Sequence, residues 1–281
     1  MLNSSFGFLL YLLLRNDVSW RLLSAKEKEA ILEANKNYNT EREDYANPEK
    51  YGAERYLNGE NWDSFQLRKE DYRGQTLLKI LERENPQKVL EVGPGAGFHS
   101  KLVCEYKTVT HYTAIDIGRA FLDYLCPCLE KIKEKKQFTY NLILGEITET
   151  ALADKYNLIV LFSTVHHIPN RTDLFNNLND LLLQNGIIFC FDPSHYMSRI
   201  LGLIKKCLFQ GYLRKKYRSG NLSTHHMCSL GEYKEIVRQV PDLKIEEVFF
   251  KPPDRIKEYN RLFIFSRWFS NEIGIVFRKT K

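Results

Sequence analysis

The sequence predicts an α/β fold in which helices cover both faces of a seven-stranded, mostly parallel sheet. The first observation is the regular alternation of short, β-rich apolar segments with helical segments from residue 88 onward, which is typical of parallel strands joined by crossover helices. The second is a glycine-rich turn, Gly93 to Gly97, between the first of these strands and the next helix. The third is the length of 281 residues, which accommodates one sizeable domain with additions.

Residues 1–74 are expected to form a helical extension or cap, followed by a main domain over 75–281. Ser24 and Glu27 make a capping box that opens a polar helix, because each side chain can satisfy a free amide at a helix start. The apolar run Phe6–Leu14 is shorter than the ~20 residues that a membrane span needs. We expect this run to pack on the main domain, in preference to a dimer contact or a membrane-surface contact.

The elements of the main domain follow from apolar periodicity and from turn residues. An Asn185-Gly186 pair is interpreted as the end of the helix before it, and the last two strands as an antiparallel hairpin. The expected strands are 88–92, 111–116, 139–144, 157–162, 186–191, 244–250 and 273–278, and the expected helices are 74–84, 98–106, 118–134, 171–184 and 230–240.

The six cysteines favour a reducing, cytoplasmic setting. Their spacing contains no C-x-x-C pair, only Cys126-Pro127-Cys128. A disulfide scaffold and a zinc site both need a different pattern. We therefore expect no bound metal.

The net charge of +6 is concentrated in an insertion at 193–226, which we interpret as a helical lid. Seven Lys and Arg residues and no acidic residue lie between Pro193 and Gly231, so the rest of the chain is nearly neutral. One helical face carries Met197, Ile200, Leu201, Ile204 and Leu208. This pattern fits a lid over a small acceptor, a contact of 197–218 with a lipid or membrane, or, with less weight, another polymer. Nucleic acid is not expected, because one short basic patch binds weakly at physiological salt.

The spacing of the turn glycines distinguishes between two classes of ligand. Dinucleotide-binding turns follow G-x-G-x-x-G, whereas here Phe98 occupies the last position and Gly97 comes one residue early. Glu91 at the strand end would repel a pyrophosphate and could attract an ammonium group. An NAD(P)-dependent oxidoreductase is therefore disfavoured.

The segment Glu91-Val-Gly-Pro-Gly-Ala-Gly97 resembles the first motif of class I S-adenosylmethionine-dependent methyltransferases. The resemblance extends over residues 75–195 and, loosely, 227–281. It implies that the loop wraps the methionine end of S-adenosylmethionine and that Glu146, where the family more often has Asp, bonds the adenine beside Ile147. Asp116 ends the second strand about twenty residues past the loop, where an acid can accept both ribose hydroxyls. The expected cofactor contacts are Glu91, Gly93, Pro94, Gly95, Asp116, Ile117, Glu146, Ile147 and Phe162.

The fourth strand runs into Phe162-Ser-Thr-Val-His-His-Ile-Pro169, which resembles the family segment at the methyl-donor end. It lacks the Asp/Asn-Pro-Pro-aromatic tetrapeptide of nucleic-acid amino methyltransferases and the Pro-Cys of pyrimidine carbon-5 enzymes. Ser163 also stands where spermidine-type synthases have Asp.

Histidine is the natural base for a hydroxyl acceptor near neutral pH. The candidates, with a structural hydrogen-bonding role as the alternative for His167, are His166, His167, His195, His225 and His226. The sequence thus predicts O-methylation of a small or amphipathic metabolite by a cytoplasmic, or membrane-associated, enzyme. A non-catalytic methyltransferase-like binding module remains the alternative.

Overall fold

A computed structural model of the chain describes residues 62–67, 71–168, 170–193, 228, 230–251 and 272–280. Most of the 1–74 extension, including Phe6–Leu14 and the capping box, lies outside these residues. So do the basic segment 197–218, the lid apart from Pro193, and the candidate bases His195, His225 and His226.

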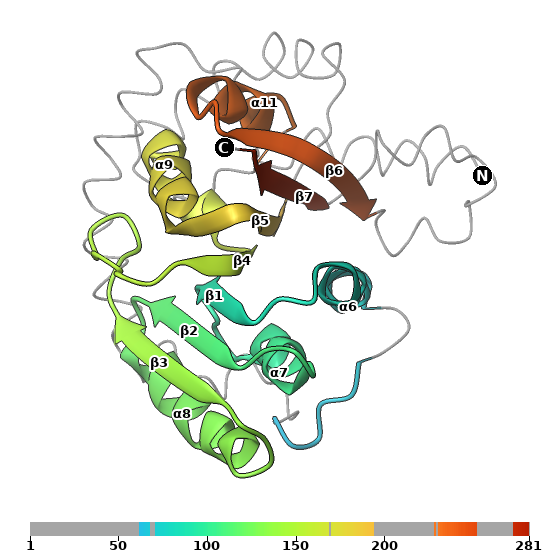
Figure 1. Cartoon of the computed structure of the whole chain (residues 1–281), viewed down its shortest axis with the longest axis vertical. Helices are drawn as coiled ribbons and strands as arrows, with labels where there is room; N and C mark the ends of the chain where they lie inside the picture. Colours follow the sequence, from blue (N-terminus) through green and yellow to red (C-terminus); the bar gives the residue numbers. More distant parts are fainter. Residues whose placement is uncertain are drawn as a thin grey trace, which may run out of the picture.

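The described residues form one seven-stranded sheet with the strand order β3-β2-β1-β4-β5-β7-β6, seen in Figure 1. Its strands are β1 (Lys88–Val92), β2 (His111–Asp116), β3 (Thr139–Leu144), β4 (Tyr156–Phe162), β5 (Leu182–Pro193), β6 (Leu243–Lys251) and β7 (Glu272–Lys279). The first five strands run parallel to one another, and β7 pairs antiparallel with both β5 and β6. This arrangement confirms the expected fold class, including the antiparallel last pair.

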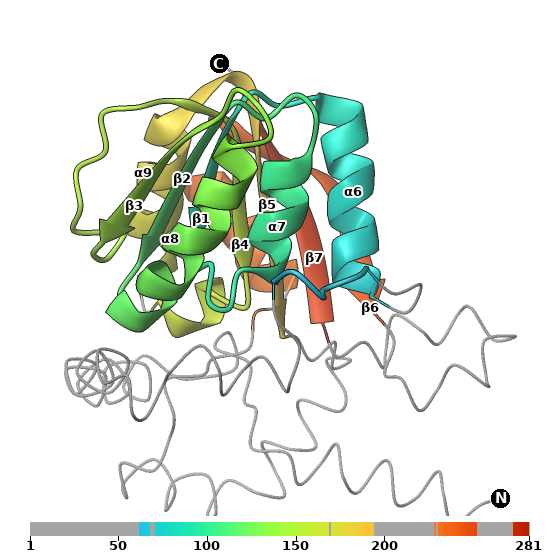
Figure 2. The ribbon, with the colours of Figure 1, turned by 90° about the horizontal axis from the view of Figure 1, so that it is seen from below.

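Helices cover the sheet on both faces (Figures 1 and 2). One face carries α6 (Tyr72–Glu84), α7 (Phe98–Glu105) and α8 (Arg119–Lys133), and the other carries α9 (Arg171–Leu181) and α11 (Leu230–Gln239). Alternate strand residues enter the two cores: Val89 packs with α6, α7 and α8, whereas Leu90 packs with α9 and α11. This alternation is the period of two that a strand buried on both faces requires.

The helix expected over 171–184 is shorter than predicted. It ends at Leu181, and β5 begins at the buried Leu182, which pairs with Tyr156. Asn185 has φ +63°, and the pairing with β4 resumes only at Ile187. The Asn-Gly signal therefore marks an irregularity inside a strand rather than a helix end, because Leu182 gains sheet pairing and burial there.

The short segment 62–67 packs against α7 and α8. Trp62 is buried, and its ring atom Cζ3 would lie 3.0 Å from a Cβ added at Gly97. The Lys101 ammonium donates to the Trp62 carbonyl oxygen at 2.6 Å, and the Phe65 ring stacks on Phe98 with centroids 4.6 Å apart. These contacts tie the end of the extension to the helix that follows the glycine turn.

Within the ranges given above, no helix combines the length and the apolar character that crossing a bilayer demands. The same residues hold no group of three or more His, Cys, Asp or Glu side chains arranged around a common metal position.

Candidate active site

A pocket of about 420 Å³ lies at the carboxyl ends of β1 to β4. The strand order reverses between β1 and β4, and in open α/β sheets ligands bind in the crevice at such a point. The strand ends are level because Val92 pairs with both Ile115 and Leu161. The lining residues are Arg73, Val92, Gly93, Pro94, Gly95, Ala96, Phe98, His99, Ile115, Asp116, Ile117, Phe121, Gly145, Glu146, Ile147, Phe162, Ser163, Thr164, His167 and Ile168.

The glycine turn presents bare backbone to this pocket. Gly93 has φ +71°, and an added Cβ would lie 2.6 Å from Oγ1 of Thr164. That hydroxyl also lies 3.0 Å from the carbonyl oxygens of Val92 and Phe162. Gly95 has φ +53°, and an added Cβ there would meet nothing within 4 Å. The positive φ strains a side chain at either position. At Gly93 contact with Thr164 opposes a side chain as well, whereas at Gly95 the space that a Cβ would take is open.

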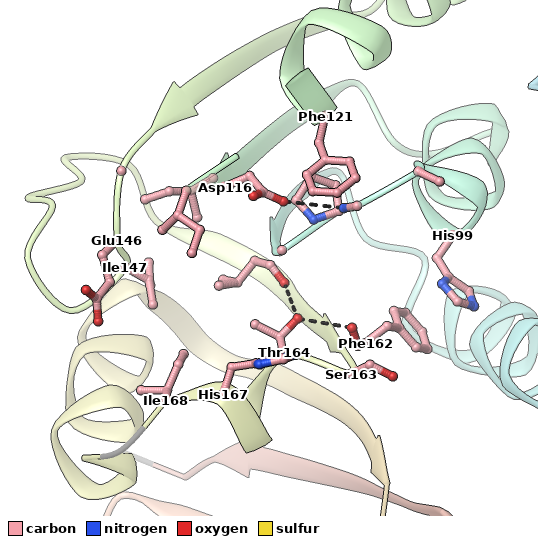
Figure 3. Close-up of a pocket in the computed structure, with 18 of the residues that line it drawn as sticks. His99, Asp116, Phe121, Glu146, Ile147, Phe162, Ser163, Thr164, His167 and Ile168 are labelled. Atoms are coloured by element: carbon pink, nitrogen blue, oxygen red, sulfur yellow. Dashed lines mark hydrogen bonds between the residues drawn. The ribbon is translucent and has the colours of Figure 1, made fainter. Parts of the chain in front are cut away.

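Asp116 is the acid that ends β2, and its carboxylate is held by backbone amides. The Gly118 N–H donates to Oδ1 at 2.7 Å and the Gly95 N–H to Oδ2 at 3.4 Å, the second of which crosses to the glycine turn (Figure 3). Burial raises the pKa of Asp116 to about 6, against the effect of these amides. The carboxylate is therefore mostly ionised at neutral pH and faces a cavity with acceptor capacity remaining.

Glu146 and Ile147 lie on the far side of the pocket from His99 (Figure 3). Glu146 accepts a hydrogen bond from the Thr148 hydroxyl at 2.8 Å, which holds its longer side chain near the end of β3. Ile147 is buried within the core of the α9 face. The pocket thus combines an acid and an apolar wall next to one another.

Glu91 does not line the pocket, although it was expected to contact a cofactor. Its side chain is 1% exposed and accepts a 2.6 Å hydrogen bond from the Tyr112 phenol. Leu90 and Val92 pack on the α9 side, so strand alternation directs Glu91 toward α7. Burial raises its pKa to about 7, partly offset by the hydroxyls of Tyr112 and Ser100.

The two adjacent histidines of the fourth-strand segment have different environments. They lie in η3 (Val165–His167), with ring centroids 4.0 Å apart. His166 is buried, and Asp192 Oδ1 lies 2.8 Å from its Nδ1 and accepts from its backbone N–H at 3.2 Å. His167 lines the pocket. Of the two, His167 alone faces the cavity.

Two titratable residues of the pocket lining, Arg73 and His99, were not predicted from the sequence. Arg73 opens the first turn of α6 and makes a two-pronged ion pair with Glu272 of β7, at 2.9 and 3.0 Å. His99 is the second residue of α7. Neither belongs to a recognisable motif, although a position just after the glycine turn was a local signal for His99.

A family model described as a methyltransferase domain matches residues 66–232 of this chain. The chain belongs to this methyltransferase family. The expected cofactor, S-adenosylmethionine, agrees with that membership. A comparison with curated proteins found no match.

Solved structures show the same fold at low sequence identity. The N-methyltransferase NodS from Bradyrhizobium japonicum WM9, in complex with S-adenosylhomocysteine, is 16% identical, with a TM-score of 0.52, over 82% of this chain and 97% of that one. An S-adenosylmethionine-dependent methyltransferase from Clostridium acetobutylicum ATCC 824 is 11% identical, with a TM-score of 0.51, over 75% and 93% of the two chains.

Proposed function

We propose that this protein transfers a methyl group from S-adenosylmethionine to an oxygen atom of a small or amphipathic acceptor. The observation that carries the proposal is the meeting of the bare glycine turn with Asp116 and Glu146 in one pocket. Three strand ends thereby contribute a stretch of backbone without side chains and two acids to a single ligand-sized cavity. The family membership supplies the reaction class.

The pocket residues fit the cofactor from end to end. Glu146 and Ile147 would hold the adenine, Asp116 the ribose hydroxyls, and Gly93 and Gly95 the amino-acid end. The fit rests on the space above Gly95, where an added Cβ would meet nothing within 4 Å, and on the remaining acceptor capacity of Asp116. Arg73 lies in the lining with its guanidinium held by Glu272, so it presents a fixed positive charge for a carboxylate.

S-adenosylmethionine supplies a methyl group on a sulfonium, whose departure needs no acid. The protein's own contribution is therefore positioning and, for a hydroxyl acceptor, removal of a proton. His167 faces the pocket from η3, and its backbone N–H donates to the Thr164 carbonyl at 3.0 Å. Ser163, at φ +52°, gives the end of β4 a sharp turn, and strained positions of this kind cluster at functional sites.

The preference for oxygen rests on the end of β4. Phe162-Ser163-Thr164 occupies the place where nucleic-acid amino methyltransferases have their Asp/Asn-Pro-Pro-aromatic tetrapeptide. The Thr164 hydroxyl donates to backbone carbonyls, and this segment has no side-chain amide or carboxylate of the kind that the tetrapeptide uses to orient an amine. A neutral histidine is the better-suited base for an alcohol or phenol.

The test is transfer of radiolabelled methyl groups to a panel of hydroxylated amphiphiles and matched primary amines, each in buffer and with vesicles. We expect labelled ethers from the hydroxylated members, with label absent for the Asp116→Ala protein. Labelling of the amines alone would contradict the oxygen preference. Binding of S-adenosylhomocysteine without transfer to any member would indicate a non-catalytic module.

A further inference from the structure

His99 projects into the pocket at the end away from Glu146 and Ile147 (Figure 3). Its ring lies flat on Phe162 of β4, with centroids 3.8 Å apart and an angle of 11° between the planes. Phe162 is in turn braced edge-on by the buried Phe189 at 5.5 Å. The orientation of the imidazole plane is therefore set by the core and does not depend on a ligand.

The His99 imidazole is neutral at physiological pH. Burial, with a smaller contribution from the positive charge of Arg73, lowers its pKa to about 3. The amino end of α7 acts in the same direction, because a helix N-terminus disfavours a nearby cation. A neutral imidazole offers one N–H donor and one lone-pair acceptor.

Both of these hydrogen-bonding groups remain unused in the described part of the chain, where neither ring nitrogen of His99 has a partner. Two other described histidines do have ring partners: Asp192 lies beside Nδ1 of His166, and the Thr139 hydroxyl bonds the His111 ring. The His99 side chain is half-buried in the pocket lining, where a polar group of a ligand can reach it. A partner from the ligand would complete the hydrogen bonding of His99.

We propose that His99 hydrogen-bonds the α-amino-acid group of the bound sulfonium nucleoside and so helps to select ligands that carry it. This inference rests on the proposed function, which assigns the far end of the pocket to adenine and the middle to ribose. The amino-acid group then falls at the end formed by His99, Phe162 and Arg73. Arg73 carries the charge opposite to that of the carboxylate. The neutral imidazole can donate a hydrogen bond to the carboxylate or accept one from the ammonium, and because it is uncharged its burial needs no desolvation of a charge.

The test compares two ligands that differ only at this end of the pocket. S-adenosylhomocysteine carries the amino-acid group, whereas methylthioadenosine has the same thioether and nucleoside without it. Binding of each is measured by titration calorimetry to the wild type, to His99→Ala and to His99→Phe. The Phe variant keeps an aromatic ring against Phe162 but has no ring nitrogens, and His111→Ala is the control far from the pocket.

We expect both His99 variants to bind S-adenosylhomocysteine about tenfold more weakly, the usual effect of losing one hydrogen bond to a charged group. Methylthioadenosine binding should stay within about twofold of the wild type. Equal weakening of both ligands, or no weakening of either, would overturn the assignment. If the wild type itself binds neither ligand, the proposed function fails and not the role of His99 alone.

A second measurement does not depend on how well the variants fold. Nitrogen NMR of the wild-type imidazoles, with the His99 signal identified by sequential assignment, reports hydrogen bonding at each ring nitrogen. S-adenosylhomocysteine should shift a His99 nitrogen, and methylthioadenosine should leave it in place. The same shift with both ligands would instead assign His99 to the nucleoside or to the methyl-acceptor side.

Discussion

The phenol of Tyr112 on β2 donates a 2.6 Å hydrogen bond to the carboxyl group of Glu91 on the neighbouring strand β1. Both residues are almost fully buried, and they lie beneath α7 rather than in the pocket. The acid of the glycine motif is therefore anchored inside the protein. We propose that this hydrogen bond fixes β1 and the start of the turn relative to β2.

This anchoring predicts that Glu91→Gln binds S-adenosylhomocysteine within about twofold of the wild type, because the glutamine oxygen still accepts from Tyr112. Calorimetric titration checks the prediction. A large loss of affinity in a folded Glu91→Gln protein would restore Glu91 as a cofactor ligand.

Glu91 also predicts a pH dependence of stability. Its folded pKa, about 7, is higher than in the unfolded chain, so the folded state holds the proton more tightly. The free energy of unfolding therefore falls as the pH rises from about 4.5 to about 7. In urea unfolding, the free energy of unfolding of Glu91→Gln should exceed that of the wild type by about 3 kcal/mol at about pH 8 and should equal it at about pH 4.5. An equal difference at both pH values would contradict this account.

Asp116 predicts a pH dependence of binding. The ionised carboxylate accepts hydrogen bonds from ribose hydroxyls, and its pKa is about 6. Affinity for S-adenosylhomocysteine should therefore rise roughly tenfold between about pH 5 and pH 7.5. Asp116→Asn should bind more weakly and lose this dependence, whereas Glu91→Gln should keep it. An Asp116→Ala protein that bound normally would refute the assignment of Asp116 to the ribose.

Alanine substitutions at the first two glycines of the turn should have different effects: mainly a loss of stability at Gly93 and mainly a loss of cofactor binding at Gly95. Gly93→Ala should lower the free energy of unfolding by more than the ~1–2 kcal/mol cost of a left-handed residue, because its Cβ would also meet Thr164 Oγ1 at 2.6 Å. Adding Thr164→Ala should recover part of that loss. Gly95→Ala should cost less stability and yet abolish measurable cofactor binding, since its Cβ enters the pocket. Equal stability losses at both glycines would argue against the close approach of Thr164 to Gly93.

The buried pair of His166 and Asp192 predicts a structural role for His166. His166→Ala would leave the fully buried Asp192 carboxylate without its imidazole partner. We expect a loss of unfolding free energy of about 2–3 kcal/mol, measured by urea denaturation, against a change below ~0.5 kcal/mol for the exposed control Lys107→Ala. A loss as small as that of the control would mean that the pair contributes no net stability.

Much of the fold and part of the site could be predicted because they are encoded locally. Each parallel strand carries its own apolar run, and the ligand edge of such a sheet is its carboxyl edge, so Gly93, Asp116 and Glu146 could be brought together from sequence alone. The end of α9 was misplaced because the burial of Leu182 against Tyr156, a tertiary contact, outweighs the local Asn-Gly signal.

The remaining site residues depend on contacts between distant parts of the chain. Arg73 reaches the pocket because Glu272, 199 residues away, holds its guanidinium. His99 is set by its stack on Phe162, on another strand. The side of the sheet that Glu91 faces could be predicted from strand alternation, because Leu90 and Val92 share the opposite face. Its hydrogen-bond partner, Tyr112, could not be predicted without the pairing register between β1 and β2.

The most direct test of the central claim, that this pocket holds S-adenosylmethionine, is calorimetric titration of the purified protein with S-adenosylhomocysteine and, separately, with NADH. We predict saturable micromolar binding of S-adenosylhomocysteine and no binding of NADH, with the former lost in Asp116→Ala. Binding of NADH without S-adenosylhomocysteine would contradict the account and identify a dinucleotide site instead.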